Sequence, residues 1–462
     1  MGVATTTVRA VNGLTARWAG VSEGGTTFSA AGVWPLLALL ADGAGGVARA
    51  ELAEALGLPA GQAAQSAHEL LAAMGSMRGL GTALGLWTRR TLELRKEWRA
   101  GLPVDAHGVL TGDLAADHRA LDAWAVQRTG GLIDGMPVML NEATQLVLAS
   151  ALAMRTQWLS PFHEVPLDTA YEPWATVPRM GLRRSSTVLD RVGVTDTPGG
   201  HVTELKVLGN NALDVHLLLG EEGMTPGHVL GVGVDLLAGR CTVVSGPGLP
   251  YGNVGPGLLV EKVHSTRPEP PSLEVTTAAY TMNASHDLLK LHGLFGLTTA
   301  RDTSRGHFPG ISDFPLAIES AHQKTMAKFG ALGFEAAAVT AFALGLTGAP
   351  DFRYLTTRIS AAFDRPFGFL ALHRHTRLVL TAGWVTDPSP FPEEEWGGTS
   401  GERDDARRLH AAVTGCAARS APDRDSPVRG RPVDRLHPRR LVAPPPRQGF
   451  PSEPKGRRVV SR

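Results

Sequence analysis

Cysteine is scarce in this 462-residue chain, and its scarcity excludes two classes of architecture. Cys241 and Cys416 lie 175 residues apart, so they form neither a disulfide framework nor a metal-binding pair. His373 and His375 share one face of a predicted strand, but no third ligand lies near them in the sequence. We therefore predict no bound metal, and two cysteines are compatible with a reducing compartment.

Long apolar runs are also absent. No segment reaches about eighteen uninterrupted apolar residues, the length at which a membrane-spanning helix is considered. Residues 1–20 contain no apolar core of the length that a secretory signal needs. On these grounds we expect no membrane partner and a cytoplasmic location.

The motifs of catalysis and nucleotide binding are missing as well. There is no G-x-S-x-G elbow that would present a nucleophilic serine. The glycine-rich stretch 79–85 lacks a preceding strand and the G-x-G-x-x-G spacing of a dinucleotide site. Aromatic and basic residues do not interleave in the body as they do in nucleic-acid-binding proteins. We therefore predict that the protein is not an enzyme, needs no cofactor and binds no nucleic acid through its folded body.

The formal net charge of +1 hides an asymmetry along the chain. Residues 401–462 hold 15 Lys and Arg against 7 Asp and Glu, a net charge of +8, together with nine prolines. The first 400 residues therefore carry a net charge of −7. Because the tail has almost no aliphatic periodicity, it cannot bury enough apolar surface to offset the entropy of ordering. We predict a folded domain over 1–390 and a disordered, solvated basic tail over 391–462.

Hydrophobic periodicity divides the body into a helical first half and a strand-rich second half. Ser29 is a candidate N-cap for the first helix, and Gly57 ends the second. The predicted helices cover 28–42, 47–56, 66–77, 117–133 and 285–296. The predicted strands cover 82–90, 144–158, 201–209, 212–220, 272–282, 362–373 and 378–385. Without an internal repeat or a regular βαβ alternation, this order predicts one mixed α+β domain.

One stretch fits neither class cleanly. Residues 333–350 read GFEAAAVTAFALGLTGAP, with Glu335 as the only charged residue before the final proline. Alanine is the best helix former, so a buried helix over 334–346 is one interpretation. Small alternating side chains also suit a strand that is buried on both faces. The residues alone leave both interpretations open.

Five segments of the chain together resemble one family, the serpins. They occur in the family's order and span about residues 5 to 390. The segments are FSAAGVWPLLALLADGAGG (28–46), LDAWAVQRTGGLI (121–133), LVLASALAMRTQWLSPF (146–162), AHQKTMAKFGALGFEAAAVTA (321–341) and DRPFGFLALHRHTRLVLTAGWVTDP (364–388).

The resemblance implies a fold and a function. The fold would have three β-sheets, about nine helices and an exposed reactive-centre loop over about 333–363. The function would be suicide-substrate inhibition of serine proteases, in which the cleaved loop enters the central sheet and traps the acyl-enzyme. The alternative is a non-inhibitory serpin that acts as a binding or chaperone-like module. The expected partner is a target serine protease held in a covalent complex, the expected state is a monomer, and the family resemblance allows an extracellular location.

The resemblance also assigns roles to individual residues. The scissile bond is expected near Leu346, Thr347 and Gly348, which suits an elastase- or subtilisin-like protease, with Arg353 and Arg358 as less central alternatives for a trypsin-like one. The predicted loop hinge is Gly333, Phe334, Glu335, Ala336, Ala337, Ala338 and Thr340. The predicted sheet-opening region is Ser29, Ser150, Trp158, Gln323 and Lys324.

Phe334 differs from the family pattern at the first inserting position, where threonine is usual. Strand alternation would point Phe334 and Ala336 inward and Glu335 outward. Because Phe334 is bulky, we expect it to slow insertion by overpacking the sheet.

Overall fold

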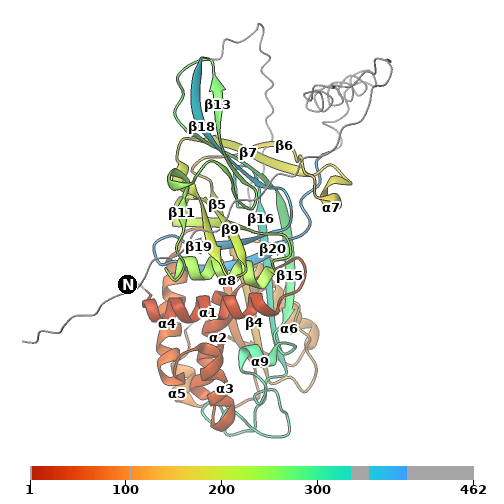
Figure 1. The fold of residues 1–462 in the computed structure, drawn as a ribbon. Coiled ribbons are helices and arrows are strands. Elements are labelled where there is room, and N and C mark those ends of the chain that lie inside the picture. Colours follow the sequence, from red (N-terminus) through yellow and green to blue (C-terminus); the bar gives the residue numbers. More distant parts are fainter. Residues whose placement is uncertain (1–2, 104–105, 335–352, 393–462) are drawn as a thin grey trace, which may run out of the picture. The chain divides into compact units, whose positions relative to one another are not determined.

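The computed structural model describes residues 3–103, 106–334 and 353–392. The chain divides into two units, Met1–Glu393 and Glu394–Arg462, and all described residues belong to the first. The basic tail predicted over 391–462 lies outside the described residues from position 393 onward. Figure 1 shows the fold of the first unit, in which helices gather at one end and strands at the other.

The described residues form nine α-helices, which confirms the predicted number. Local signals fix several of their ends: Ser29 accepts a hydrogen bond from the Gly32 amide at the start of α2, and Gly57 ends α3 in the left-handed conformation. The helices are α1 Thr5–Val21, α2 Ala30–Gly43, α3 Gly46–Leu56, α4 Ala60–Ser76, α5 Lys96–Ala100, α6 Leu114–Thr129, α7 Glu172–Ala175, α8 Pro226–Leu237 and α9 His292–Phe295. Short 3₁₀ turns are η1 Leu189–Arg191, η2 Asn210–Ala212 and η3 Gly246–Gly248.

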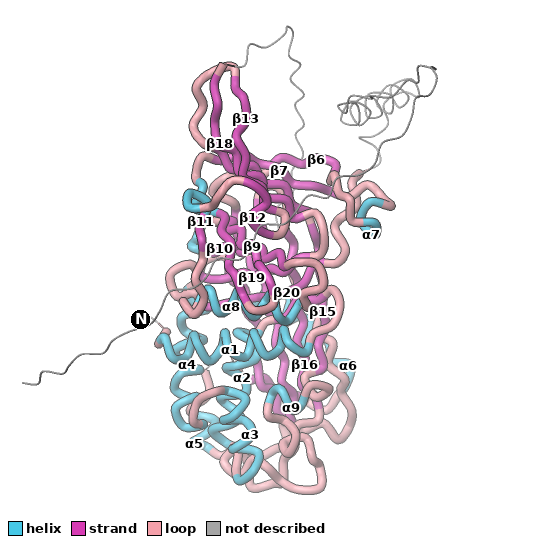
Figure 2. Tube along the Cα trace, viewed as in Figure 1, coloured by secondary structure: helices cyan, strands magenta, loops and turns pink. Residues whose placement is uncertain are grey.

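The strands form three sheets in the part of the chain that is described, as predicted (Figure 2). The first, named here the β19 sheet, contains the two hairpins expected from the alternating runs in the second half of the chain. Its order is β1-β20-β19-β10-β9-β8-β11. The strands are β1 Thr26–Phe28, β8 Val192–Thr197, β9 Gly200–Val207, β10 Leu213–Gly220, β11 Val244–Ser245, β19 Phe367–His373 and β20 Leu378–Val385.

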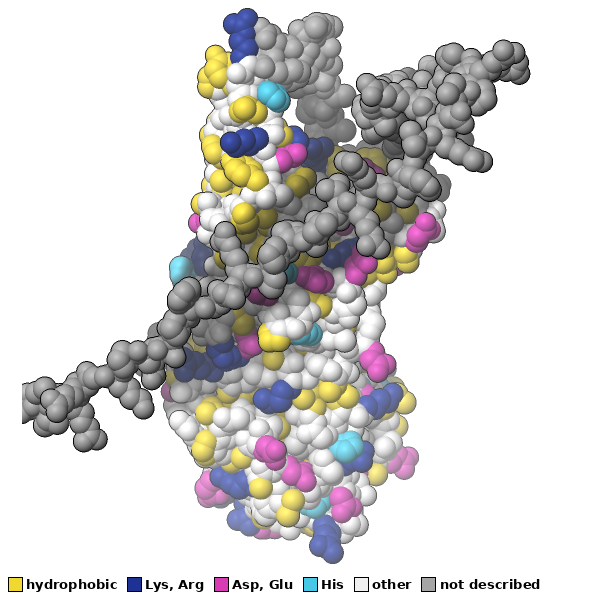
Figure 3. Space-filling model, viewed as in Figure 1, with side chains coloured by type: hydrophobic (Ala, Val, Ile, Leu, Met, Phe, Trp, Pro, Cys, Tyr) yellow, Lys and Arg dark blue, Asp and Glu magenta, His cyan; other side chains and the backbone are white. Residues whose placement is uncertain are grey.

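The second sheet, the β18 sheet, follows the order β12-β13-β18-β14-β7-β6. Strand β18 lies between β13, which is antiparallel to it, and β14, which is parallel to it. Strands β13 and β18 project from the rest of the sheet as a ribbon (Figure 1), on which hydrophobic side chains are exposed (Figure 3). The bounds are β6 His163–Pro166, β7 Met180–Ser186, β12 Gly252–Gly255, β13 Leu258–Ser265, β14 Ser272–Ala278 and β18 Tyr354–Phe363.

The third sheet, the β16 sheet, follows the order β3-β2-β4-β16-β17-β5, and β15 also pairs with β16. Helix α2 contacts β2 and β4 of this sheet and β20 of the β19 sheet, and thirteen of its fourteen residues are buried. The hydrophobic core therefore lies between these two sheets. The strands are β2 Leu80–Arg89, β3 His107–Leu110, β4 Leu146–Met154, β5 Thr156–Gln157, β15 Tyr280–Asp287, β16 Ser320–Phe329 and β17 Gly333–Phe334.

Two sequence predictions are wrong in this region. The single strand expected over 272–282 is broken after Ala278, and its two parts join different sheets. The helix expected over 285–296 begins only at His292, because residues 285–287 extend β15 and pair with β16. Pairing with β16 satisfies the backbone hydrogen-bonding groups of residues 285–287. Helical periodicity in the local sequence cannot predict this long-range pairing.

Helix α1 was not expected from the sequence, although it buries Val11, Leu14 and Trp18. Most residues of α1 are small or polar, so the apolar stripe along the helix is narrow. Across the described ranges, no helix is both long and apolar enough to cross a membrane.

Candidate functional site

The two central strands of the β16 sheet run side by side in parallel. Strand β16 pairs with β4 from Ser320↔Val147 to Thr325↔Leu152. All nine residues of β4 are buried, which explains its near-continuous apolar sequence. The register between the two strands stops at Thr325, although β16 continues to Phe329. Beyond this point another segment of the chain lies between the end of β16 and β5, the short strand that follows β4.

That segment is β17, the first two residues of the predicted loop. Phe334 pairs with Phe329 at the end of β16 and with Thr156 in β5, and Gly333 pairs with Gln157. A tight turn joins β16 to β17, closed by the Gly330 amide donating to the Gly333 carbonyl at 3.0 Å. The first two residues of the predicted loop therefore form a strand between β16 and β5.

Close packing explains the residue types in β17. A Cβ atom at Gly333 would lie 2.2 Å from the Thr156 carbonyl oxygen, so this approach requires glycine. The Phe334 side chain is 2% exposed, and its ring centroid lies 6.3 Å from that of Phe369. The sheet thus accommodates the bulky residue that was expected to hinder entry.

The turn before β17 is held by the segment that follows β5. The Trp158 and Phe162 amides donate to the Leu332 and Ala331 carbonyls at 2.9 and 2.8 Å. The Trp158 indole N–H donates to the Gly330 carbonyl at 2.8 Å. Trp158 and Phe162 also pack on Phe329. The sequence marked Trp158 as a sheet-opening residue, and the structure places it at the turn through which the loop enters.

Ser29, Ser150 and Gln323 meet at the middle of the sheet and form a buried hydrogen-bonded cluster, which we call the serine–glutamine cluster. The Gln323 amide accepts from the Ser29 N–H and donates to the Ser29 carbonyl, both at 2.8 Å. It also donates to Ser150 Oγ at 3.2 Å. All three residues are at most 1% exposed. The cluster therefore links β16 to β4 and both strands to α2.

Gly32 is part of the same arrangement. Ser150 Oγ donates to the Gly32 carbonyl at 2.9 Å. A Cβ atom at Gly32 would lie only 2.8 Å from Ser150 Oγ. The absence of a side chain at Gly32 therefore allows the serine hydroxyl to reach the helix backbone.

Lys324 does not belong to the cluster. It alternates with Gln323 along β16, so its side chain leaves the opposite face of the strand and pairs with Asp134. The remaining predicted loop residues lie outside the described residues: Glu335, Ala336, Ala337, Ala338, Thr340, Leu346, Thr347 and Gly348.

The other end of the loop is held in the β18 sheet. Arg358, one alternative for the cleavage site, lies within β18, and its guanidinium pairs with Glu261 of β13 at 2.8 Å. Arg353 lies immediately before this strand. The sequence reasoning missed β13 altogether, although Leu258 and Val260 alternate with less buried residues in the way that strands do.

The electrostatics around β17 are those of a nearly apolar site. Tyr280 stacks on Phe329 with ring centroids 5.4 Å apart, and complete burial raises the pKa of its phenol well above the usual value. Charged groups are absent from the ring contacts of Phe329 and Phe334 among the described residues. An incoming strand with small or apolar side chains is what this environment accepts.

In the β16 sheet the pairing of the parallel strands β4 and β16 ends at Thr325, and β17 then lies between β16 and β5. The sequence model of the family described as "Serpin (serine protease inhibitor)" matches residues 7–173 and 259–388. The chain therefore belongs to the serpin family.

Relatives and solved structures agree with this assignment. The "Putative serpin-Z6C" of Oryza sativa subsp. japonica is 24% identical over 403 residues, which is 80% of this chain and 92% of the relative. Human thyroxine-binding globulin with its ligand has the same fold at 17% identity, with a TM-score of 0.62 over 83% of this chain and 98% of that one. Serpin48 of the insect Tenebrio molitor, described as highly specific, is 17% identical with a TM-score of 0.59, over 82% of this chain and 98% of that one.

Proposed function

We propose that this protein inhibits serine proteases by acting as a substrate whose cleaved loop enters the β16 sheet between β4 and β16. The observation that carries the proposal is the position of Gly333 and Phe334, which form β17 between β16 and β5. A strand that continues beyond Phe334 in the same direction would run between the two parallel strands. The family assignment supports the same activity, because its members are generally protease inhibitors.

The chemistry begins as ordinary proteolysis. The protease serine attacks a loop carbonyl, forms an acyl-enzyme and releases the amine of the downstream residue. The upstream segment is then free of its tether to β18 and continues along the path that β17 has started. The attached protease moves with it, and distortion of its oxyanion hole prevents water from completing hydrolysis. We propose Leu346, Thr347 and Gly348 as the region of cleavage.

The energetics favour insertion. The six residue pairs that join β4 to β16 must separate, and so must the contact between Gln323 and Ser150. An inserted strand of about a dozen residues would form ladders on both of its sides, and each hydrogen bond contributes about 1 kcal/mol. With the burial of apolar side chains, the net gain is on the order of 10 kcal/mol. Slowing deacylation a thousandfold needs only about 4 kcal/mol.

The experiment is to incubate the purified full-length chain with elastase, subtilisin and trypsin and to analyse the mixtures on denaturing gels. We expect a covalent complex that survives SDS with at least one of the first two proteases. Mass spectrometry of the released C-terminal fragment identifies the cleaved bond. Cleavage by all three proteases without any complex would contradict the proposal.

A second readout distinguishes the non-inhibitory alternative. Insertion after cleavage should raise the melting temperature sharply, because a strand has been added to the β16 sheet. A cleaved chain with an unchanged melting temperature would instead indicate a binding module.

A further inference from the structure

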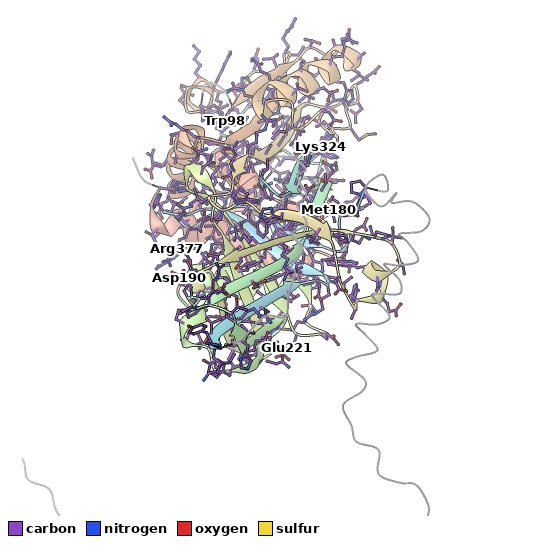
Figure 4. All side chains as sticks on the ribbon, turned by 90° about the horizontal axis from the view of Figure 1, so that it is seen from above. Trp98, Met180, Asp190, Glu221, Lys324 and Arg377 are labelled. Carbon is purple, nitrogen blue, oxygen red and sulfur yellow. The ribbon has the colours of Figure 1, made fainter. Side chains whose placement is uncertain are left out.

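A cationic pocket lies beside residues 158–162, the segment that holds the turn between β16 and β17. It has a volume of about 100 Å³ and is open to solvent. It lies where the segment after β5 meets β7, β9, β14 and η1. Part of its wall is aliphatic, with Leu208 and Leu273 as examples, and the polar part includes Ser160 and Ser186. Asp190 of η1 is labelled in Figure 4 and marks this side of the molecule.

Among the described residues, three cationic side chains line this pocket, Arg184, Arg191 and Lys206, and no carboxylate does. Two acids adjacent in sequence or space to these cations, Asp190 and Glu204, already have partners. Asp190 pairs with Arg191 at 3.5 Å. Glu204 pairs with Lys206 at 3.4 Å and with His216 at 2.8 Å. The field inside the pocket is therefore positive.

Arg184 is the least compensated of the three. It is 9% exposed, and none of the described carboxylates lies within ion-pair distance of it. One N–H donates to the Ser160 carbonyl at 2.7 Å, and the guanidinium carbon lies 4.2 Å from the centroid of the Phe162 ring. Burial, and then the charge of Arg191, lowers the pKa of Arg184 to about 10. A guanidinium has five N–H donors, so Arg184 keeps donors for a ligand that supplies the missing negative charge.

We propose that this pocket binds a small organic anion whose carboxylate or phosphate group lies among Arg184, Arg191 and Lys206 and whose short aliphatic part contacts Leu208 and Leu273. Arginine forks bind both kinds of anionic group in two-pronged geometry. Release of the anion's hydration shell is compensated by three cations in a partly desolvated site. The aliphatic wall adds affinity in proportion to the apolar area that it covers.

The pocket is connected to the loop entrance by direct contacts. Arg184 stacks on Phe162, whose amide donates to the Ala331 carbonyl at 2.8 Å and whose ring lies 5.9 Å from that of Phe329. The Leu159 amide donates to the Leu208 carbonyl at 3.0 Å. A ligand that fixes Arg184 therefore restrains Phe162 and, through it, the turn that leads into β17.

Calorimetry with the full-length chain tests the site itself. The probes are hexanoate and inorganic phosphate, with hexanamide as the uncharged counterpart and sodium chloride to equalise ionic strength. We expect saturable binding of hexanoate, weaker binding of phosphate and at least tenfold weaker binding of hexanamide. Arg191→Gln and Lys206→Gln should each weaken hexanoate binding at least tenfold without touching the Arg184 contact to Ser160. Absence of saturable binding of either anion would overturn the site.

Arg183→Gln is the matched control. Arg183 is the sequence neighbour of Arg184 in β7 but lies on the opposite face of the strand, where it pairs with Glu274. Arg183→Gln removes one positive charge, as Arg191→Gln does, but outside the pocket. If hexanoate binds in the pocket, its affinity for the Arg183→Gln variant should be unchanged. An equal loss of hexanoate affinity in Arg183→Gln and Arg191→Gln would show that binding depends only on the net charge of the protein, and would overturn the site.

Hydrogen exchange tests the connection to the turn. We expect hexanoate, but not hexanamide, to slow exchange at least threefold at the amides of Trp158, Phe162 and Gly330, which hold the turn. Unchanged exchange at saturating hexanoate would overturn the connection. Neither measurement involves a protease, so their failure is distinguishable from failure of the proposed inhibition.

Discussion

The side-chain amide of Gln323 donates to Ser150 Oγ at 3.2 Å, across the boundary between the parallel strands β16 and β4. The same amide forms two hydrogen bonds with the backbone of Ser29 at the start of α2. One fully buried side chain therefore ties two strands and a helix together. In the proposed mechanism, separation of the strands would break or rearrange this contact, so the serine–glutamine cluster would set part of the barrier to insertion.

Gln323→Ala should lower the free energy of unfolding by about 3 kcal/mol, because it leaves the buried Ser29 N–H without a partner and removes the hydrogen bonds from Gln323 to the Ser29 carbonyl and Ser150 Oγ. Urea denaturation followed by circular dichroism measures the change. Lys324→Ala, at the next position on the exposed face, is the control and should change stability by less than about 1 kcal/mol. Equal effects of the two substitutions would contradict the role of the cluster.

Gly333→Ala should disrupt the entry of the loop into the sheet, because the new Cβ atom would lie 2.2 Å from the Thr156 carbonyl oxygen. We expect a loss of about 1 to 3 kcal/mol of stability and faster hydrogen exchange at Phe334. Gly231→Ala in α8 is the matched control, since no atom lies within 4 Å of its added Cβ. This control should be neutral or more stable by about 0.5 to 1 kcal/mol. A Gly333→Ala chain with unchanged exchange at Phe334 would exclude the close approach.

Phe334→Lys should convert the protein from inhibitor to substrate, because an unpaired charge would have to remain in an apolar part of the sheet. We expect the yield of SDS-stable complex to fall at least tenfold, while cleavage of the loop continues. Gel densitometry at fixed protease gives the ratio of complex to cleaved chain. Phe334→Leu keeps an apolar side chain and should retain most of the complex. Full complex formation by Phe334→Lys, in a chain whose circular dichroism is unchanged, would count against insertion at this position.

Acidification should destabilise the fold through His286. Burial lowers the pKa of its imidazole below the ordinary value of 6.5, although the ring donates to the Thr27 carbonyl at 2.8 Å. Because the folded pKa is below the unfolded one, the unfolded chain binds the extra proton first as the pH falls. The stabilisation is thus complete above about pH 6.5 and is lost progressively as the pH falls towards the folded pKa.

The measurement is the free energy of unfolding of the wild-type chain and of His286→Gln at pH 7.5 and pH 5.5. The glutamine amide can still donate towards Thr27 but does not titrate in this range. We expect the wild type to lose more stability than the variant, by at most about 1.4 kcal/mol per pH unit. Identical losses in the two proteins would show that His286 does not contribute to the pH dependence.

Local sequence signals predicted several elements correctly. Ser29 caps α2 and Gly57 ends α3, because capping depends on side-chain and backbone chemistry within a few residues. The hairpins around β9–β10 and β19–β20 follow from alternation. The strand β15 was misjudged because pairing with β16 outweighs the helical periodicity of its last residues. Most residues of α1 are small or polar, so its hydrophobic periodicity was too weak to predict a helix.

The sequence named Ser29, Ser150, Trp158, Gln323 and Lys324 as the sheet-opening region, and this role stays a prediction. The structure brings Ser29, Ser150 and Gln323 into contact, whereas Lys324 lies apart from them. In the structure this side chain points away from the cluster, because adjacent residues of a strand face opposite sides. The cationic pocket gave no sequence signal, since its three charges come from β7, η1 and β9 and are brought together only by the packing of two sheets.

By itself, the sequence determined the α+β class and the serpin family, because these depend on periodicity and on the order of short segments. Only the tertiary structure decided that Phe334 fits into the β16 sheet. Whether a large side chain overpacks a sheet depends on the volume that its neighbours leave, and here the Phe334 ring is buried with its centroid 6.3 Å from that of Phe369. Such complementarity between distant segments arises from packing in three dimensions and not from residue order.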